Sequence, residues 1–135
     1  MSCVLRISGK NFDVDDFIAM TKLKPCQIFK KGEPKFKTLP NGKKLTYSGV
    51  NIVVSRADFK DFKEQTKDAT EFLHKHRNEL NKFIKSKNQY EAFVLDFGIN
   101  SENDLIQCYQ FPSDLLKLAA GLNISIWLSQ YLMKK

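Results

Sequence analysis

The stretch that decides the fold runs from Arg56 to Lys87 and reads RADFKDFKEQTKDATEFLHKHRNELNKFIKSK. A stripe recurs in it at steps of three and four residues, made by Phe59, Phe62, Thr66, Ala69, Leu73, His76, Leu80 and Phe83. This spacing is the period of an α-helix, and it predicts one long amphipathic helix over residues 56–87. Phe72 and Ile84 widen the apolar side, so we expect the helix to pack on a sheet rather than form a coiled-coil seam.

The ends of this helix also have signals in the sequence. Ser55 followed three residues later by Asp58 resembles a capping box, with a shorter acid in place of the usual Glu. We therefore expect the helix to begin directly after Ser55 and to end near Asn88.

Alternation of apolar and polar residues predicts strands on both sides of the long helix. The patterns cover residues 3–7, 45–54, 92–98, 105–111 and 124–131, with a shorter extended piece at 26–29. The second pattern contains Gly49, a position that suits a bulge, and the third ends at Gly98. Since the loop over residues 100–104 is short, we expect the strands before and after it to pair antiparallel.

Two shorter helices and two turns complete the expected elements. The first helix follows Asp13, which can cap it, and stops before Pro25. The second begins at Pro112 and ends at Gly121, because a glycine readily adopts the left-handed backbone conformation that commonly ends a helix. Turns are expected at residues 31–34 and 40–42, and the second contains the Asn-Gly pair that is typical of a hairpin.

The order of these elements predicts a single α+β domain over residues 1–135. The strands keep a polar side, which is visible at Arg6, Asn51, Gln107 and Ser125, so helices should lie mainly on the other face. We expect a largely antiparallel sheet of five or six strands, built from ferredoxin-like strand-helix-strand units.

The composition is that of a globular protein. Of the 135 residues, 42% are hydrophobic and 27% are charged, and the eleven Phe residues can supply a packed core. Residues 1–7 contain no apolar run long enough for a signal peptide, and no stretch approaches the roughly 18 apolar residues of a membrane-spanning helix. We therefore expect a cytoplasmic protein with no membrane partner.

The positive charge is concentrated in one segment. The net charge is +7, and residues 22–44 hold eight lysines against one acid, Glu33. The segment and its flanks interleave Phe29, Phe36 and Tyr47 with these cations, a mix that can follow phosphates and stack on bases. It contains no arginine, the residue preferred for bidentate contacts to bases and phosphates. A solvated loop, an acidic protein partner, nucleic acid and an anionic membrane surface all fit this pattern. The candidate binding residues are Lys30, Lys31, Lys35, Phe36, Lys37, Lys43 and Lys44.

Few residues have a pattern typical of catalysis or metal binding. His74 and His76 are two residues apart on a helix, so they point to different sides and cannot hold one metal ion together. Asp96 is the carboxylate expected to be partly buried, yet no titratable partner accompanies it by spacing. The sequence also has no glycine-rich phosphate loop and no nucleophile elbow. We expect no cofactor, no metal and no catalytic residue.

The three cysteines are predicted to be reduced thiols. Cys3, Cys26 and Cys108 are odd in number and far apart, so they fit neither a disulfide framework nor a zinc site. Lysines flank Cys26 in the sequence, but no histidine base lies near it to support a reactive thiol.

Several stretches resemble a bacterial family that is known only as a domain of unknown function. They are the opening strand and helix up to Pro25, the Lys31-Gly32 turn, and the segments 95–99, 111–116 and 124–126. Members of that family are small intracellular proteins without an assigned reaction, and some resemble the immunity proteins that neutralise toxins. The resemblance implies no catalytic residues.

The leading hypothesis is a non-enzymatic protein-binding module, immunity-like or regulatory, whose lysine-rich segment binds an acidic partner surface. The first alternative is nucleic-acid binding through the same segment, residues 22–44. The second is an enzyme of unrecognised type, which would need a deep pocket around Asp96 that brings in a distant polar group. The sequence leaves the oligomeric state open.

Overall fold

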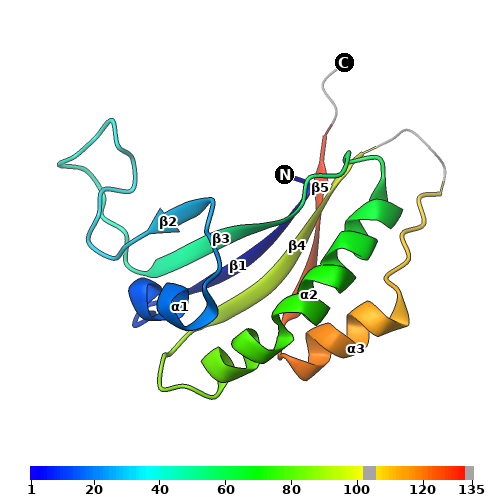
Figure 1. Ribbon diagram of the computed structural model, residues 1–135. Helices are drawn as coiled ribbons and strands as arrows, with labels where there is room; N and C mark the ends of the chain where they lie inside the picture. The colour runs from blue at the N-terminus through cyan, green and yellow to red at the C-terminus, as the bar shows by residue number, and fades with distance from the viewer. Residues whose placement is uncertain (102–105, 133–135) are drawn as a thin grey trace.

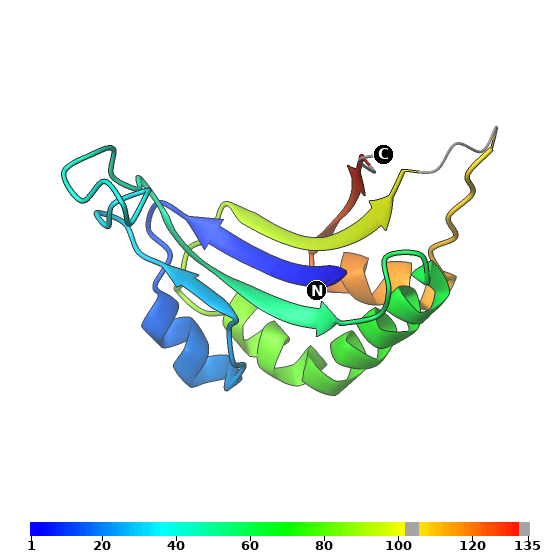
Figure 2. The same cartoon turned by 90° about the horizontal axis from the view of Figure 1, so that it is seen from above.

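The computed structural model describes residues 1–101 and 106–132. Within these residues five strands and three helices follow one another in the order β1 (Cys3–Gly9), α1 (Val14–Thr21), β2 (Gln27–Phe29), β3 (Ser48–Ser55), α2 (Phe62–Ile84), β4 (Ala92–Asn100), α3 (Ser113–Gly121) and β5 (Ser125–Tyr131). The strands form one sheet in the order β2-β3-β1-β4-β5, and the helices cover one of its faces (Figures 1 and 2). We call the other face, which carries no helix, the open face.

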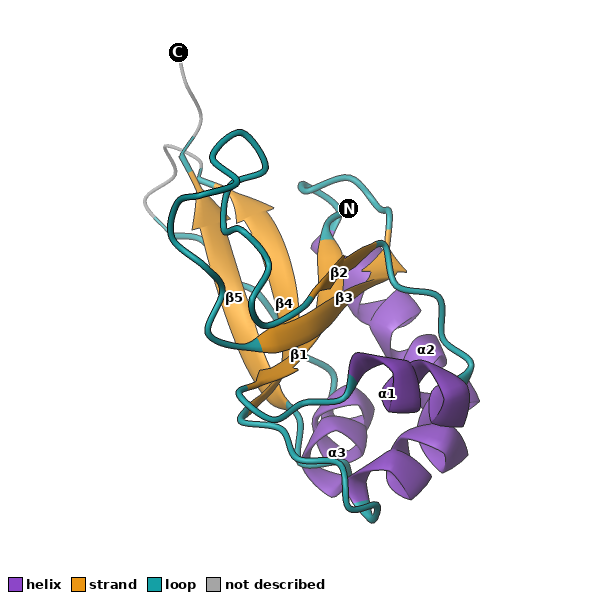
Figure 3. Ribbon diagram, turned by 90° about the vertical axis from the view of Figure 1, so that its left-hand side faces the viewer, coloured by secondary structure: helices purple, strands orange, loops and turns teal. Residues whose placement is uncertain are grey.

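The first four strands have the ferredoxin-like arrangement. α1 connects β1 to β2 and α2 connects β3 to β4, so each helix crosses over the strand that lies between its pair. The pairs β2-β3, β3-β1 and β1-β4 are antiparallel, and only β4-β5 is parallel. The predicted fold class is therefore confirmed, with five strands in the described part of the chain and the helices gathered on one side of them (Figure 3).

The core lies between the sheet and α2. On β1 the alternating residues Cys3, Leu5 and Ile7 are fully buried and face the helices. The apolar stripe of α2 meets them, because Leu73, Leu80 and Phe83 are also fully buried in the same cluster. Phe83 packs edge-on against Phe17 of α1, with the ring centres 4.9 Å apart. The prediction that the long helix packs on a sheet is therefore confirmed.

The start of α2 was predicted wrongly. Ser55 is the last residue of β3, where it pairs with Cys3, so the strand uses the residues that the capping box would have needed. The N-cap is Asp61, whose carboxylate accepts a hydrogen bond from the Glu64 N–H at 3.1 Å. Phe59 consequently lies outside the helix, and its ring packs against Tyr131 with 5.7 Å between ring centres.

The end of α2 also differs from the expectation. The helix ends at Ile84, and Asn88 lies beyond it in the connection to β4. The Asn88 side chain instead accepts from the Asp13 N–H and donates to the Asp13 carbonyl, at 3.1 and 3.0 Å. Asp13 itself caps α1 as expected, since its carboxylate accepts from the Asp16 N–H.

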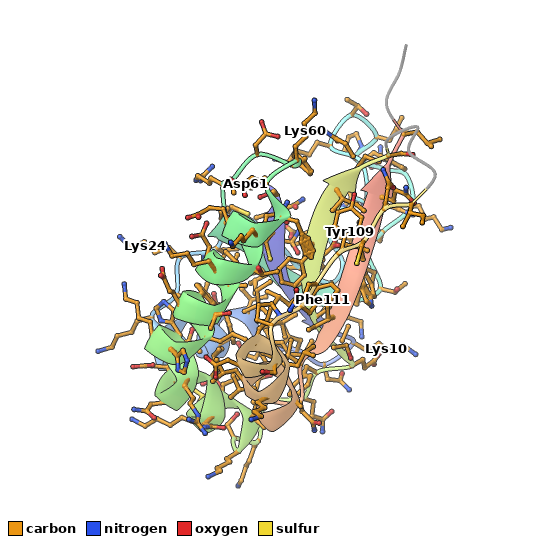
Figure 4. The ribbon with its side chains drawn as sticks, turned by 90° about the vertical axis from the view of Figure 1, so that its right-hand side faces the viewer. Lys10, Lys24, Lys60, Asp61, Tyr109 and Phe111 are labelled. Carbon is orange, nitrogen blue, oxygen red and sulfur yellow. The ribbon has the colours of Figure 1, made fainter. Side chains whose placement is uncertain are left out.

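The strand predicted at residues 105–111 is wrong over its described part, 106–111, and Leu105 lies outside the described residues. β4 already has β1 and β5 as its two neighbours, so this segment cannot pair with β4 as the sequence predicted. Tyr109 and Phe111 still alternate inward, and both rings pack against Phe62 with 5.1 Å between centres (Figure 4). The alternation of apolar residues in this segment therefore reflects packing of one side against the core, and the described residues 106–111 do not pair with a strand.

Three local details also differ from the expectation. The bulge in the β1–β3 pair lies at Val54, because Cys3 pairs with Ser55 and Val4 with Val53. Gly49 has a different role: a Cβ there would lie 2.7 Å from the Ile7 carbonyl oxygen and would overlap the Phe29 ring. After α3 the left-handed residue is Asn123, with φ 57°, and not Gly121.

Candidate functional site

Residues 30–47 form a hairpin that projects from the β2–β3 end of the sheet, and we call it the lysine hairpin (Figures 1 and 3). Backbone hydrogen bonds join its two arms. The Gly32 N–H donates to the Leu45 carbonyl, the Leu45 N–H to the Glu33 carbonyl and the Lys35 N–H to the Lys43 carbonyl, at 2.8 to 2.9 Å. The segment is therefore an ordered projection with a defined shape.

All of the predicted binding residues lie on this hairpin and are exposed to solvent. Among the described residues, Lys30 is the one member of the set that forms an ion pair, with Asp15 at 3.3 Å. The only acid of the hairpin, Glu33, accepts a hydrogen bond from the Lys30 N–H at 2.6 Å. Because Glu33 bonds a backbone N–H and forms no ion pair with a hairpin lysine among the described residues, most of the lysine side chains can contact a partner.

The aromatic residues of the segment separate into two groups. Phe29 and Tyr47 pack edge-on at the base of the hairpin, with 5.4 Å between ring centres. Phe36 is 55% exposed, and the Lys35 ammonium lies 5.9 Å from the centre of its ring. Phe36 therefore accompanies the cations toward solvent, whereas Phe29 and Tyr47 pack together at the base of the hairpin, with Tyr47 itself 41% exposed.

A second feature is a row of polar side chains across the open face. Each strand contributes one member, and the row consists of Gln27, Asn51, Arg6, Asp96 and Ser129. The Asn51 amide donates to the Gln27 side-chain oxygen at 2.8 Å. Arg6 Nε donates to Asp96 Oδ2 at 3.0 Å, and the Ser129 hydroxyl donates to Asp96 Oδ1 at 2.5 Å.

Asp96 thus has partners that the sequence did not reveal. It is 7% exposed, and each of its two carboxylate oxygens accepts a hydrogen bond, one from Arg6 and the other from Ser129. Those residues are 90 and 33 positions away along the chain, so only the sheet register brings them together. A carboxylate bonded in this way acts as a structural acceptor that ties β1, β4 and β5 on the open face.

The two histidines both lie on α2 and have different partners. His74 Nε2 is 3.0 Å from Asp114 Oδ2, a contact that joins α2 to α3. His76 packs on Phe72, and burial, followed by the charge of Lys75, lowers the pKa of its imidazole. Over residues 1–101 and 106–132, no three metal-binding side chains are grouped so that they could hold an ion.

The cysteines are all free thiols in different environments. Cys3 is buried, and burial raises the pKa of its thiol, with a further contribution from the negative charges of Asp96 and Asp68. Cys26 and Cys108 are exposed, and the Cys26 thiol lies 3.2 Å from the Asn51 carbonyl oxygen.

A hollow at the N-terminal end of α2 lies on the helix side of the molecule. Lys60, Asp61 and Tyr109 are among the residues that line it (Figure 4). None of the described residues that line this hollow belongs to the polar row. The hollow is therefore not the deep pocket around Asp96 that an enzyme would need.

A family model described as DUF4279, a domain of unknown function, matches residues 1–133. The chain belongs to the DUF4279 family. No curated protein and no solved structure matches it. The DUF4279 match confirms the predicted resemblance to a domain family of unknown function. The family description names neither a ligand nor a reaction. In the described part of this DUF4279 chain, none of the helices has the length and apolar character needed to cross a membrane.

Proposed function

We propose that this DUF4279 protein is a non-enzymatic binding module whose lysine hairpin contacts an acidic surface on a partner protein. The observation that carries the proposal is the set of exposed lysines on a projecting hairpin whose only acid bonds its own backbone. Complementary charge of this kind speeds association and selects among partners.

The ordered shape of the hairpin favours binding in addition to its charge. Its two arms are held by backbone hydrogen bonds, and the Phe29 and Tyr47 rings fix its base. Less backbone entropy is therefore lost when a partner binds than would be lost by a disordered loop of the same composition. The sequence resembles a bacterial family in which some members are similar to immunity proteins, and this resemblance favours a cytoplasmic role in which the partner is a toxin domain or a regulated protein.

A charge-reversal experiment tests the proposal. In the hairpin variant, Glu replaces Lys31, Lys35, Lys37 and Lys43. In the control variant, which has the same net charge, Glu replaces four exposed residues in and just after α2, namely Lys75, Lys82, Lys85 and Lys87. Both variants and the wild type are used to capture partners from the source cell, and mass spectrometry identifies the bound proteins at low and high salt.

The wild type and the control variant are expected to retain an acidic protein that the hairpin variant loses, and high salt should release it. The product of the neighbouring upstream gene is the first protein to examine among those captured. A partner list that is the same for the hairpin variant and the wild type would contradict the proposal.

Nucleic acid is the second candidate ligand of the hairpin, because exposed Phe36 sits beside Lys35 and can stack on a base. In a salt titration with mixed oligonucleotides, the logarithm of the binding constant should then fall linearly with the logarithm of salt concentration. Phe36→Ala should weaken binding by about 1–3 kcal/mol. Weak binding that does not change with salt would remove this candidate.

A further inference from the structure

The second edge of the sheet, formed by β5, has little of the usual protection against pairing. In the described part of the chain, the side-chain contact of β5 outside β4 that bears on this edge is that of the Gln130 amide, which donates to the Gln107 side-chain oxygen at 3.4 Å. Among the residues that the structure describes, β4 is the one neighbour of β5 in the sheet, and the β4–β5 register runs without a bulge over seven residues. The sequence of β5, SIWLSQY, contains no charged residue and no proline. Natural edge strands are normally short, charged, bulged or covered, because a free row of backbone groups templates another strand.

The opposite edge shows the contrast within the same molecule. Strand β2 is only three residues long, and Lys24 and Lys30 lie on either side of it in the sequence. The lysine hairpin also leaves the sheet at that end (Figure 1). Lysines therefore flank β2 closely, whereas the seven residues of β5 carry no charge and the next lysines after it in the sequence are Lys134 and Lys135. The β5 edge is thus the less charged of the two edges at which two copies of this +7 chain could meet.

Apolar side chains are exposed on both faces of β5. Trp127 is 52% exposed on the open face, where it lies beside Asp96 in the β4–β5 register. Leu128, on the face of the helices, is 44% exposed, and Tyr131 is 50% exposed. Large apolar side chains left in water next to a free edge are typical of a surface that a partner covers.

We propose that β5 pairs antiparallel with β5 of a second copy of this chain, so that the two five-stranded sheets become one continuous sheet. A two-fold axis through Leu128 places that residue opposite itself, Trp127 opposite Ser129, and Ile126 opposite Gln130. No charged side chain of either strand meets a like charge in this register. Both lysine hairpins then lie at the far ends of the joined sheet, where they remain free for the partner proposed above.

Molar mass in solution is the first test. Sedimentation velocity on the full chain is expected to show a monomer–dimer equilibrium across about a hundredfold range of concentration, as mass action requires. Leu128→Lys places two ammonium groups opposite each other and is expected to leave a monomer. Ile28→Lys is the matched control, since Ile28 is 46% exposed on the β2 edge, and this variant should dimerise like the wild type. Circular dichroism checks that both variants fold.

A cross-link gives an independent reading of the register. In a chain with Cys26→Ser and Cys108→Ser, a cysteine at position 128 faces its own copy across the two-fold axis, at a separation that suits a disulfide. Oxidation of the Leu128→Cys variant should give a covalent dimer, and oxidation of the Ile28→Cys variant should not. A wild type that is monomeric at every concentration overturns the proposal, and so does a dimer that Leu128→Lys leaves intact.

Discussion

Asp96 is the residue on which the open face depends most, because it joins three strands through two side-chain hydrogen bonds. Replacing it by alanine leaves Arg6 and Ser129 without their acceptor in a partly buried setting, since the side chain of Arg6 is 37% exposed and that of Asp96 is 9% exposed. We expect Asp96→Ala to lower the free energy of unfolding by about 1–3 kcal/mol, measured by urea denaturation. Asp96→Asn, which keeps one acceptor oxygen, should cost less.

Asp15→Ala is the control for this prediction. Asp15 also pairs with a cation, Lys30, but both side chains are well exposed, and ion pairs in that setting add little stability. Equal losses for Asp15→Ala and Asp96→Ala would show that the bonds of Asp96 do not stabilise the sheet.

Cys3 is expected to be inert in the folded protein. Because its thiol is buried and its pKa is raised, a thiol reagent should modify Cys26 and Cys108 quickly and should reach Cys3 only after denaturation in urea. Peptide mapping after a timed exposure to iodoacetamide measures this order. Rapid alkylation of Cys3 under native conditions would contradict the buried placement.

The same thiol predicts a pH dependence of stability. Its pKa is higher in the folded chain than in the unfolded chain, so above about pH 9 the unfolded state releases the Cys3 proton first. The free energy of unfolding should therefore fall with rising pH more steeply in the wild type than in Cys3→Ala. Urea denaturation of both proteins between neutral and alkaline pH gives the two slopes, and identical slopes would count against the shift.

Among the elements, α2 depends on a cap that the sequence analysis did not choose. Asp61→Ala removes the acceptor of the Glu64 N–H and should destabilise the protein by about 1 kcal/mol. Asp58→Ala is the comparison, since its carboxylate accepts a bond from the Lys60 N–H in the loop before the helix. Urea denaturation should show the larger loss for Asp61→Ala, and the reverse order would place the helix start earlier.

Periodicity was sufficient wherever one side of an element faces the core. It identified α2 from Phe62 onward and the strands around Leu5, Ile52 and Leu95, because burial on one side imposes the period directly. The same periodicity was misleading at 106–111. Tyr109 and Phe111 both face Phe62 there without strand pairing, and a paired strand would show the same alternation. The boundary of α2 was missed because Ser55 and Asp61 are both good caps, and only the pairing of Ser55 with Cys3 decides between them.

The lysine hairpin and the polar row differ in how far the sequence alone could predict them. The lysine hairpin could be found from the sequence, because its charges are contiguous along the chain. The polar row could be expected only as a polar side of the strands, visible at Arg6 and Asn51. Its hydrogen bonds depend on strand order and register, which a single sequence does not contain.

At the scale of the whole molecule, the lysine hairpin and the fold should be separable. No residue between Leu23 and Val50 belongs to the core cluster among the described residues. Replacing residues 33–44 by Asn-Gly, a pair suited to a two-residue turn, should change the free energy of unfolding by less than about 1 kcal/mol. The shortened protein should also lose the acidic partner. A much larger loss of stability would show that the hairpin supports the fold.

The position of β1 in the sheet has a consequence for the speed of folding. This strand comes first along the chain yet lies in the middle of the sheet, paired with residues 48–55 on one side and 92–97 on the other. Neither pair can close from a tight turn, so the chain must bring distant segments together before contacts compensate for the lost entropy. We expect refolding to be slow for a chain of this size, in the range of milliseconds to seconds that non-local pairing imposes.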